Sequence, residues 1–283
     1  MAQILNGKEV AAALNERLAA RSAELKTKGI EPTLAILRVG ERDDDLSYER
    51  GATKRAQECG VAVRNVVLPA DCTQEQLEEA FDAINTDPAV HGILMFRPLP
   101  EQLDDKPIIA KMDPAKDIDG ITAGSMAGVF MNSGQGFAPC TAQACIEILD
   151  HYGIDPKGKR TTVIGRSLVI GRPVAMMMMH RHSTISICHT RTVDMPSVTK
   201  EADIVIVAAG KMETVGAEYF KPGQIVIDVG IGWNEEKGKL CGDVKYDEVE
   251  PIVDMITPVP GGVGSVTTSV LISHVIDSAE KNA

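Results

Sequence analysis

The segment VIGRSLVIGRP, residues 163–173, decides the fold of the second half of this chain. An apolar strand runs into Gly165, the chain turns through Arg166 and Ser167, and a helix begins near Gly171. A strand that turns at a glycine into a helix start presents free backbone N–H groups, which bind anions such as phosphate. The pattern therefore predicts an α/β unit with an anion site at this turn.

The next strand, TISIC at 184–188, indicates which nucleotide would bind, because the glycine turn lacks GxGxxG spacing and is weak evidence alone. In sites that select NAD, this strand commonly leads to an Asp or Glu that bonds the ribose 2′-hydroxyl. Here it leads to His189, Thr190 and Arg191, with no acid. Arg191 and Arg166 suit a 2′-phosphate, which favours NADP, with NAD the weaker expectation. The residues alone leave open that both arginines are solvated loop cations.

Helix-like and strand-like segments alternate along most of the chain, which is typical of α/β proteins. Strands as apolar as these, joined by helix-length connections, imply parallel sheets covered on both faces. Residues 116–137 are glycine-rich and weakly periodic, so we expect a long loop there. The expected strands are 33–39, 61–68, 91–96, 161–165, 184–188, 202–210 and 224–231, and the expected helices are an opening helix ended by Gly29, 44–59, 73–85 capped by Thr73, 142–151, 172–181 and a C-terminal helix after 265.

Composition excludes several classes of protein. The 283 residues suffice for about two domains, and 29 basic against 40 acidic side chains give a formal charge of −11. That charge argues against a general nucleic-acid surface or an anionic membrane surface. The chain has no apolar run of about 18 residues and no signal-peptide pattern, so a cytoplasmic protein is expected. The six cysteines are scattered without CxxC spacing, which predicts reduced thiols and no metal site.

A second glycine-rich segment, TPVPGGVG at 257–264, precedes the C-terminal helix. Pro258 and Pro260 fix their φ angles, whereas the glycines carry no Cβ, so a ligand can lie directly against the main chain. The alternative is an ordinary tight turn, because glycine after proline is common turn chemistry.

Several motifs, spread from Asp117 to Gly264, resemble the methylenetetrahydrofolate dehydrogenase/cyclohydrolase family, and the similarity covers nearly the whole chain. The resemblance implies two α/β domains, residues 1–140 plus 265–283 and a Rossmann domain at 141–264, with folate bound in the cleft between them. It implies a homodimer that oxidises 5,10-methylenetetrahydrofolate with NADP and hydrolyses the methenyl product to 10-formyltetrahydrofolate. The motifs are PAKDIDG, PCT, VIGRSLVIGRP, ICHTRT, IDVGI and TPVPGGVG.

The resemblance also assigns roles to individual residues. Tyr48 matches the aromatic residue that packs on the aminobenzoyl ring of folate, and Asp119 matches the aspartate that bonds the pterin edge. Both are expected to contribute to catalysis, although Asp119 alone could equally be a turn residue. The remaining substrate-binding expectations are Pro260, Gly261 and Gly262, and the cofactor-binding expectations are Gly165, Arg166, Ser167, Gly171, Thr190, Arg191 and Ile231.

The chain departs from the family pattern at the positions that handle protons. The family has a lysine four residues after the tyrosine and a glutamine in a motif resembling VQLPLP. This chain has Ala52 in YERGATK and Phe96 in MFRPLP, with Arg97 as a new cation. Neither alanine nor phenylalanine can carry out acid–base chemistry. Smaller departures, at Ala142 and Ala144 after PCT, fall in the connection between the domains.

Three functions are compatible with these observations. The first is an NADP-dependent methylenetetrahydrofolate dehydrogenase whose cyclohydrolase activity is impaired or absent. The second is a bifunctional enzyme that uses another proton carrier, and the third is a non-catalytic folate or nucleotide binder. Accumulation of the methenyl product during turnover distinguishes them, because it is expected only for the first.

Overall fold

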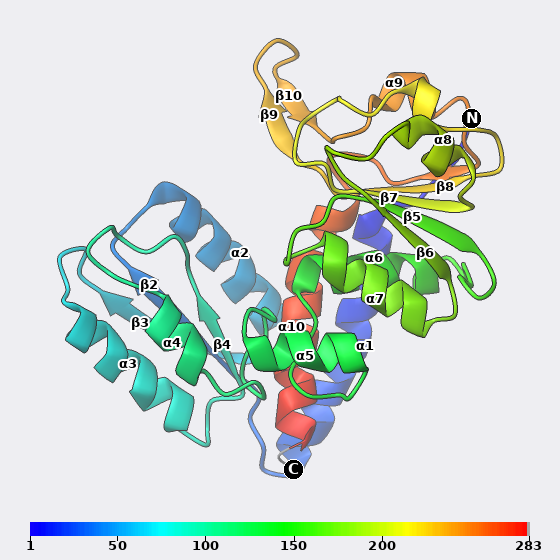
Figure 1. Ribbon diagram of the computed structural model, residues 1–283. Coiled ribbons are helices and arrows are strands. Elements are labelled where there is room, and N and C mark those ends of the chain that lie inside the picture. Colours follow the sequence, from blue (N-terminus) through cyan, green and yellow to red (C-terminus); the bar gives the residue numbers. More distant parts are fainter. Residues whose placement is uncertain (282–283) are drawn as a thin grey trace. The chain divides into compact units, whose positions relative to one another are not determined.

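The computed structural model describes residues 1–281, which form two compact units (Figure 1). One unit consists of Met1–Ala12 and Thr141–Thr267, and the other of Ala13–Cys140 with the residues from Thr268 onward. The expected boundaries differ at the N-terminus, because residues 1–12 belong with the Rossmann-type unit and not with the first domain. The reason is strand pairing: β1 (Gln3–Ile4) forms a parallel pair with β11 (Met255–Ile256).

The first unit is built on a six-stranded sheet in which every pair of neighbouring strands is parallel. This confirms the expected parallel sheet, although several strands are shorter than the apolar runs in the sequence. Figure 1 shows α6 and α7 over one face of the sheet and α8 and α9 over the other. In sheet order, the strands are β1, β11, β8 (Ile225–Asp228), β7 (Ile204–Val207), β5 (Arg160–Ile164) and β6 (Thr184–Cys188).

Short elements complete this unit. An antiparallel hairpin of β9 (Gly232–Asn234) and β10 (Lys239–Cys241), absent from our expectations, follows β8. Its strands have only three residues each, too short for a clear alternation of apolar and polar side chains. The helices are α6 (Cys140–His151), α7 (Gly171–His180), α8 (Met195–Lys200) and α9 (Tyr246–Val249), with 3₁₀ turns at Ala217–Tyr219 and Val263–Ser265.

The second unit has a three-stranded parallel sheet in the order β3, β2, β4. Phe81 and Leu77, both fully buried, pack with Leu37 and Met95 from the strands, so α3 and α4 cover one face. Figure 1 shows α2 on the opposite face. The strands are β2 (Thr33–Val39), β3 (Ala62–Leu68) and β4 (Gly92–Met95), and the helices are α1 (Gly7–Thr27, which begins in the first unit), α2 (Asp43–Glu58), α3 (Gln74–Thr86), α4 (Lys106–Lys111), α5 (Ala123–Met131) and α10 (Thr267–Lys281).

Local sequence signals were right about one helix boundary and wrong about one loop. Thr73 caps α3 in a capping box, in which its hydroxyl accepts from Gln76 N and the Gln76 side chain accepts from Thr73 N. The expected loop at 116–137 instead contains α5. Thr122 caps this helix, and Asn132 ends it in the left-handed conformation. Its small residues gave no helical periodicity to detect.

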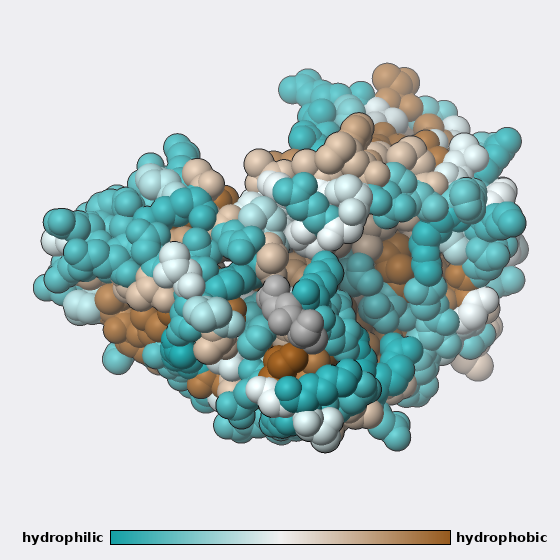
Figure 2. Space-filling view, turned by 90° about the horizontal axis from the view of Figure 1, so that it is seen from below, coloured by the Kyte–Doolittle hydropathy of each residue, from teal (hydrophilic) through white to brown (hydrophobic). Residues whose placement is uncertain are grey.

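Among the residues that the structure describes, no helix is both long and apolar enough to cross a membrane. Figure 2 shows a face of the molecule on which hydrophilic residues predominate and hydrophobic residues form separate patches. All six cysteines are buried free thiols, and the described residues contain no group of three or more His, Cys, Asp or Glu side chains arranged to hold a metal ion.

Candidate functional site

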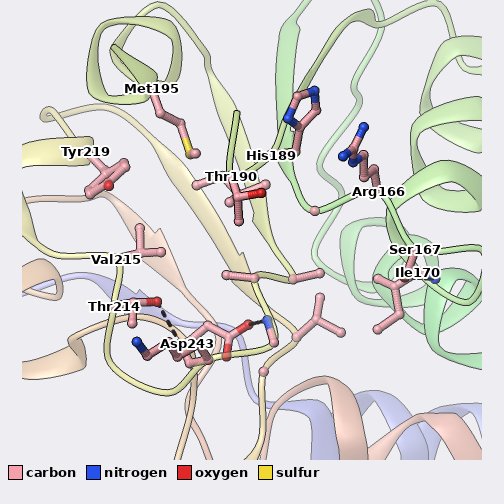
Figure 3. A pocket seen from close by; sticks show the side chains of 18 of the residues that line it. Arg166, Ser167, Ile170, His189, Thr190, Met195, Thr214, Val215, Tyr219 and Asp243 are labelled. Carbon is pink, nitrogen blue, oxygen red and sulfur yellow. Dashed lines mark hydrogen bonds between the residues drawn. The ribbon is translucent and has the colours of Figure 1, made fainter. Parts of the chain in front are cut away.

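A cavity of about 720 Å³ opens in the first unit, lined by residues that follow the carboxyl ends of β5, β6, β7 and β8 (Figure 3). This is the edge where parallel α/β sheets bind ligands. The cavity collects predicted residues from distant parts of the chain. Those that line it are Gly165, Arg166, Ser167, Thr190 and Ile231, whereas Gly171 and Arg191 do not.

The glycine turn after β5 has a conformation and a packing that require glycine. Gly165 has a φ of 125°, and a Cβ there would lie 2.2 Å from the carbonyl oxygen of Ala208. A Cβ on Gly171 would lie 2.3 Å from the Gly165 oxygen, so both glycines let main chain pack on main chain. The Ser167 hydroxyl accepts from Ile170 N at 3.1 Å, which holds the turn closed before α7 begins. The first turn of α7 is tied back to the same residues: Arg172 N donates to the Ser167 oxygen and Val174 N to the Ile170 oxygen, both at 3.0 Å, and Pro173 has no N–H.

Cationic and neutral polar groups line the part of the cavity next to this turn. Figure 3 shows Arg166 beside His189, with Met195 and Tyr219 on the opposite side. The sequence analysis did not assign His189 a role, although it directly follows β6; its Nδ1 accepts from Arg191 N at 3.1 Å. Among the described residues that line the cavity, only Asp243 carries a carboxylate. This carboxylate accepts a hydrogen bond from Gly210 N at 2.8 Å.

A smaller cavity of about 210 Å³ lies in the same unit, between the end of β8 and the TPVPGGVG segment. Pro260, Gly261 and Gly262 line it, as do Val229–Ile231, which also line the larger cavity. One side of the glycine segment is covered by the chain itself: Gly7 N donates to the Gly261 oxygen at 2.8 Å. A Cβ on Gly7 would lie 2.0 Å from the Gly262 oxygen. We expected a ligand to lie directly against this glycine segment. On one side, the start of α1 lies against it instead.

The second unit contains two of the residues that the resemblance assigned to folate, Tyr48 and Asp119. Tyr48 on α2 is 42% exposed, and its ring meets the ring of Phe96 edge to face, with centroids 5.8 Å apart and planes at 86°. Ala52, one helical turn beyond Tyr48, is only 1% exposed. The side of α2 next to Tyr48 is thus closed by packing and carries no acid–base group at position 52.

Asp119 lies in the same unit in electrostatically unusual surroundings. The pKa of its carboxyl is raised to about 6: burial is the largest cause and the neighbouring Asp117 adds to the rise, whereas Arg97 and a hydrogen bond from the Cys140 thiol oppose it. Burial also raises the pKa of the Tyr48 hydroxyl well above its ordinary value, with smaller effects from Cys140 and Asp119. Asp119 is therefore a carboxylate that loses its charge in mildly acidic solution.

The turn that carries Asp119 is held by its neighbour. The carboxylate of Asp117 accepts from Thr122 N at 2.8 Å and from the Ser125 hydroxyl at 2.7 Å, and it is 1% exposed. Arg97 Nη1 lies 3.5 Å from Asp105 Oδ2 in a partly exposed ion pair. The charge of Arg97 also lowers the pKa of Asp119. In the PAKDIDG motif, the carboxylate of Asp117 therefore stabilises the turn, and the carboxylate of Asp119 is the one available to a ligand.

Parallel sheet, glycine turn and cationic cavity define a dinucleotide-binding α/β protein with a second α/β unit. Comparison with protein families identifies it further. Residues 5–119 match the model "Tetrahydrofolate dehydrogenase/cyclohydrolase, catalytic domain", and residues 139–283 match "Tetrahydrofolate dehydrogenase/cyclohydrolase, NAD(P)-binding domain". The chain belongs to the tetrahydrofolate dehydrogenase/cyclohydrolase family.

Relatives match over the full length. The chain is 49% identical to the bifunctional protein FolD of Carboxydothermus hydrogenoformans, over 99% of this chain and 98% of that protein. It is 44% identical to the bifunctional protein FolD of Clostridium botulinum strain Hall, over all of both chains. The crystal structure of the bifunctional enzyme FolD from Campylobacter jejuni superposes with a TM-score of 0.95 at 36% identity, over 100% of both chains.

The Gly165 turn yields a test of the NAD(P) site. Gly165→Ala should weaken NADPH binding by more than about tenfold, because its Cβ would collide with the Ala208 oxygen and displace the turn. Gly158→Ala is the matched control: Gly158 also has a positive φ of 75°, but a Cβ there meets nothing within 4 Å. The measurement is titration with NADPH followed by its fluorescence. Equal affinities for the two variants would contradict the assignment of this turn.

Proposed function

We propose that this protein oxidises 5,10-methylenetetrahydrofolate to 5,10-methenyltetrahydrofolate with NADP and does not catalyse the hydrolysis of the product. The observation that carries the second part is the buried Ala52 next to the Tyr48–Phe96 aromatic pair. These are the positions where the family pattern has a lysine and a glutamine. Proton transfer needs a titratable group within hydrogen-bond reach of the reacting atoms, and neither position now offers one.

The oxidation itself needs alignment more than acid–base chemistry. When bound, NADP supplies the hydride acceptor, and the nitrogen lone pair of the folate assists the departure of the hydride. The protein's task is to hold two carbon atoms in reacting geometry. In this proposal Asp119 accepts hydrogen bonds from the pterin edge, Tyr48 packs on the aminobenzoyl ring, and the Gly165–Ser167 turn holds the cofactor phosphates.

Several features support NADP in preference to NAD. Arg166 lines the cavity beside His189 and Thr190, and the only carboxylate among the described lining residues, Asp243, is already bonded to Gly210 N. A 2′-phosphate needs such cations and is repelled by a free acid at that position. A FolD from Trypanosoma brucei, 34% identical with a TM-score of 0.89, has been crystallised with NADP. A homodimeric assembly stays a prediction.

One observation favours a second candidate function. The relatives at 44% and 49% identity are named bifunctional, so an enzyme that hydrolyses the methenyl product through another proton carrier is the alternative. Arg97 lies close enough to influence Asp119, but a guanidinium stays protonated at all relevant pH values and cannot exchange protons as a lysine can. Asp119, with a pKa of about 6, is the titratable group that such a mechanism would have to use.

We expect purified enzyme to release methenyltetrahydrofolate and to hydrolyse it no faster than buffer does. Absorbance of the methenyl compound, followed during turnover and with methenyltetrahydrofolate as the starting substrate, checks this directly. Enzyme-dependent loss of the absorbance in the second assay would establish the bifunctional alternative.

The paired variant tests the cause. Ala52→Lys alone should restore little hydrolysis, because a lysine in a filled position beside Phe96 costs about 1–3 kcal/mol in overpacking. Ala52→Lys with Phe96→Gln should hydrolyse faster than the sum of the two single variants, since groups that act together are non-additive. If the double variant keeps its dehydrogenase rate and gains no hydrolysis, the two substitutions are not the whole cause.

Arg166 tests the choice of cofactor. Arg166→Ala should raise the KM for NADP roughly 10- to 100-fold while changing the KM for NAD much less, because one charge-assisted pair to the 2′-phosphate is lost. Initial rates with both cofactors measure this. Parallel changes in the two KM values, or a higher kcat/KM with NAD in the unmodified enzyme, would contradict the proposed selectivity.

Asp119 gives the expected pH dependence. Its pKa of about 6 leaves the carboxylate ionised above that pH, and only the ionised form accepts two hydrogen bonds from the pterin edge. Affinity for a stable analogue, 5-formyltetrahydrofolate, should fall as the pH drops through about 6, approaching tenfold per pH unit below it. Asp119→Asn should bind about 1–3 kcal/mol more weakly at pH 7.5 and lack this dependence. A variant with unchanged affinity would remove Asp119 from the site.

A further inference from the structure

The carboxylate of Asp228 in the first unit is buried, and Asp228 lines the smaller of the two cavities. Asp228 is the last residue of β8 and is 2% exposed. Its Oδ1 accepts from Gly230 N at 3.0 Å and from Asp243 N at 3.1 Å, and its Oδ2 accepts from Val244 N at 3.0 Å. One side chain therefore holds its own loop and a segment 15 residues further along the chain.

The main chain of the same residue ties in a third segment. Asp228 N donates to the hydroxyl of Thr257 at 2.7 Å, and this hydroxyl lies 3.3 Å from the Asp228 oxygen, to which it donates. Thr257 is fully buried and begins the TPVPGGVG segment. Asp228 is thus the point where the loop after β8, the Asp243–Val244 segment and the proline–glycine segment meet.

Glycines allow these segments to come so close. A Cβ on Gly242 would lie 1.9 Å from Asp228 Oδ2, and a Cβ on Gly230 would lie 2.3 Å from Asp243 Cγ. The pKa of the Asp228 carboxyl is raised to about 7, mainly by burial and also by the charge of Asp243, while the backbone N–H groups of Val244, Asp243 and Gly230 oppose that rise. A buried carboxylate is costly unless its oxygens are hydrogen-bonded, so the three N–H donors and the carboxylate depend on each other.

The residues next to Asp228 form the wall that the two cavities share. Val229, Gly230 and Ile231 line both cavities, and Asp243 lines the larger one. At one end of the wall Val229 N donates to the Val207 oxygen at 2.9 Å, and at the other end Ile231 leads into the β9–β10 hairpin. The carboxylate bond to Gly230 N, in the middle of the wall, is therefore well placed to fix where the wall stands.

We propose that Asp228 is a positioning residue: it fixes the Val229–Ile231 wall and, through that wall, the alignment on which the oxidation depends. The inference rests on the proposed function for its kinetic consequence, but not for its structural one. Asp228 touches neither substrate nor cofactor in this proposal and acts through the three segments that it joins.

The structural part is tested without any ligand. Asp228→Asn keeps the shape of the side chain but replaces one acceptor oxygen with an NH₂ group, which cannot accept from a backbone N–H. Amide hydrogen exchange of the ligand-free protein should become roughly 10-fold faster or more at Gly230, Asp243 or Val244. Unchanged exchange at all three amides in a folded variant would overturn the proposal.

The kinetic part predicts a separation of kcat from KM. Asp228→Asn should lower kcat of the dehydrogenase roughly 10- to 100-fold, because small misplacements of reacting groups have effects of this size. The KM for NADP should stay within about threefold, since the phosphate turn at Gly165 is not joined to Asp228. A kcat within about threefold of the parent, or a KM for NADP that rises as much as kcat falls, would overturn it.

The matched control is Asp254→Asn. Asp254 is exposed, and its carboxylate also accepts from a backbone N–H, that of Gly223 at 3.0 Å, but it lines neither cavity. This variant should leave kcat, KM and the exchange of the three amides unchanged. An equal loss of kcat in the control would show that any lost carboxylate bond in this unit has the same effect, and would overturn the specific role of Asp228.

Two further measurements keep the proposal open to refutation. If Asp228→Asn does not fold, Thr257→Val and Thr257→Ser replace it: the serine keeps the hydroxyl and should retain more of kcat than the valine, and equal values would overturn the proposal.

If the parent oxidises no methylenetetrahydrofolate, the proposed function fails, and energy transfer to bound NADPH decides instead. Trp233, the only tryptophan, follows the wall, so Asp228→Asn should change transfer from its indole, and unchanged transfer would overturn the proposal.

Discussion

Parallel strand pairing is the constraint on which the rest of this structure depends. Because β5, β6, β7 and β8 all run in the same direction, the residues after their carboxyl ends meet at one edge of the sheet. The glycine turn after β5 and the polar residues after β6 come together there, although they lie far apart in the sequence. At several of these glycines a Cβ atom would collide with a neighbouring stretch of main chain. Because glycine has no Cβ, the loops can approach each other more closely there than with any other residue.

In the second unit, the packing of a few side chains bears on the chemistry. Tyr48 stands edge to face with Phe96, and Ala52 is buried one helical turn from Tyr48, so both departures from the family pattern lie close to Tyr48. The surrounding unit superposes on FolD structures in spite of them, as the TM-score of 0.95 over the full chain indicates. The fold therefore does not depend on these two positions, whereas the proposed loss of hydrolysis does.

The apolar runs at 33–39 and 224–231 predicted buried parallel strands because such strands are hydrophobic on both faces, and that information is local. Thr73 predicted the start of α3 for the same reason, since a cap acts within one helical turn. The helix α5 was missed because its small residues have no apolar stripe. The short strand β1 was missed because two residues carry no period, and its partner β11 lies some 250 positions away.

The sequence by itself determined the α/β class, the glycine turn after β5, the residues expected to bind cofactor and folate, and the loss of the acid–base pair at Ala52 and Phe96. These follow from residue type and short-range spacing. Only the tertiary structure decided that Gln3–Ile4 join the larger sheet, that His189 stands beside Arg166, and that Asp228 holds three chain segments together. Such contacts join residues distant in sequence, and a buried hydrogen bond between them leaves no periodic trace in either segment.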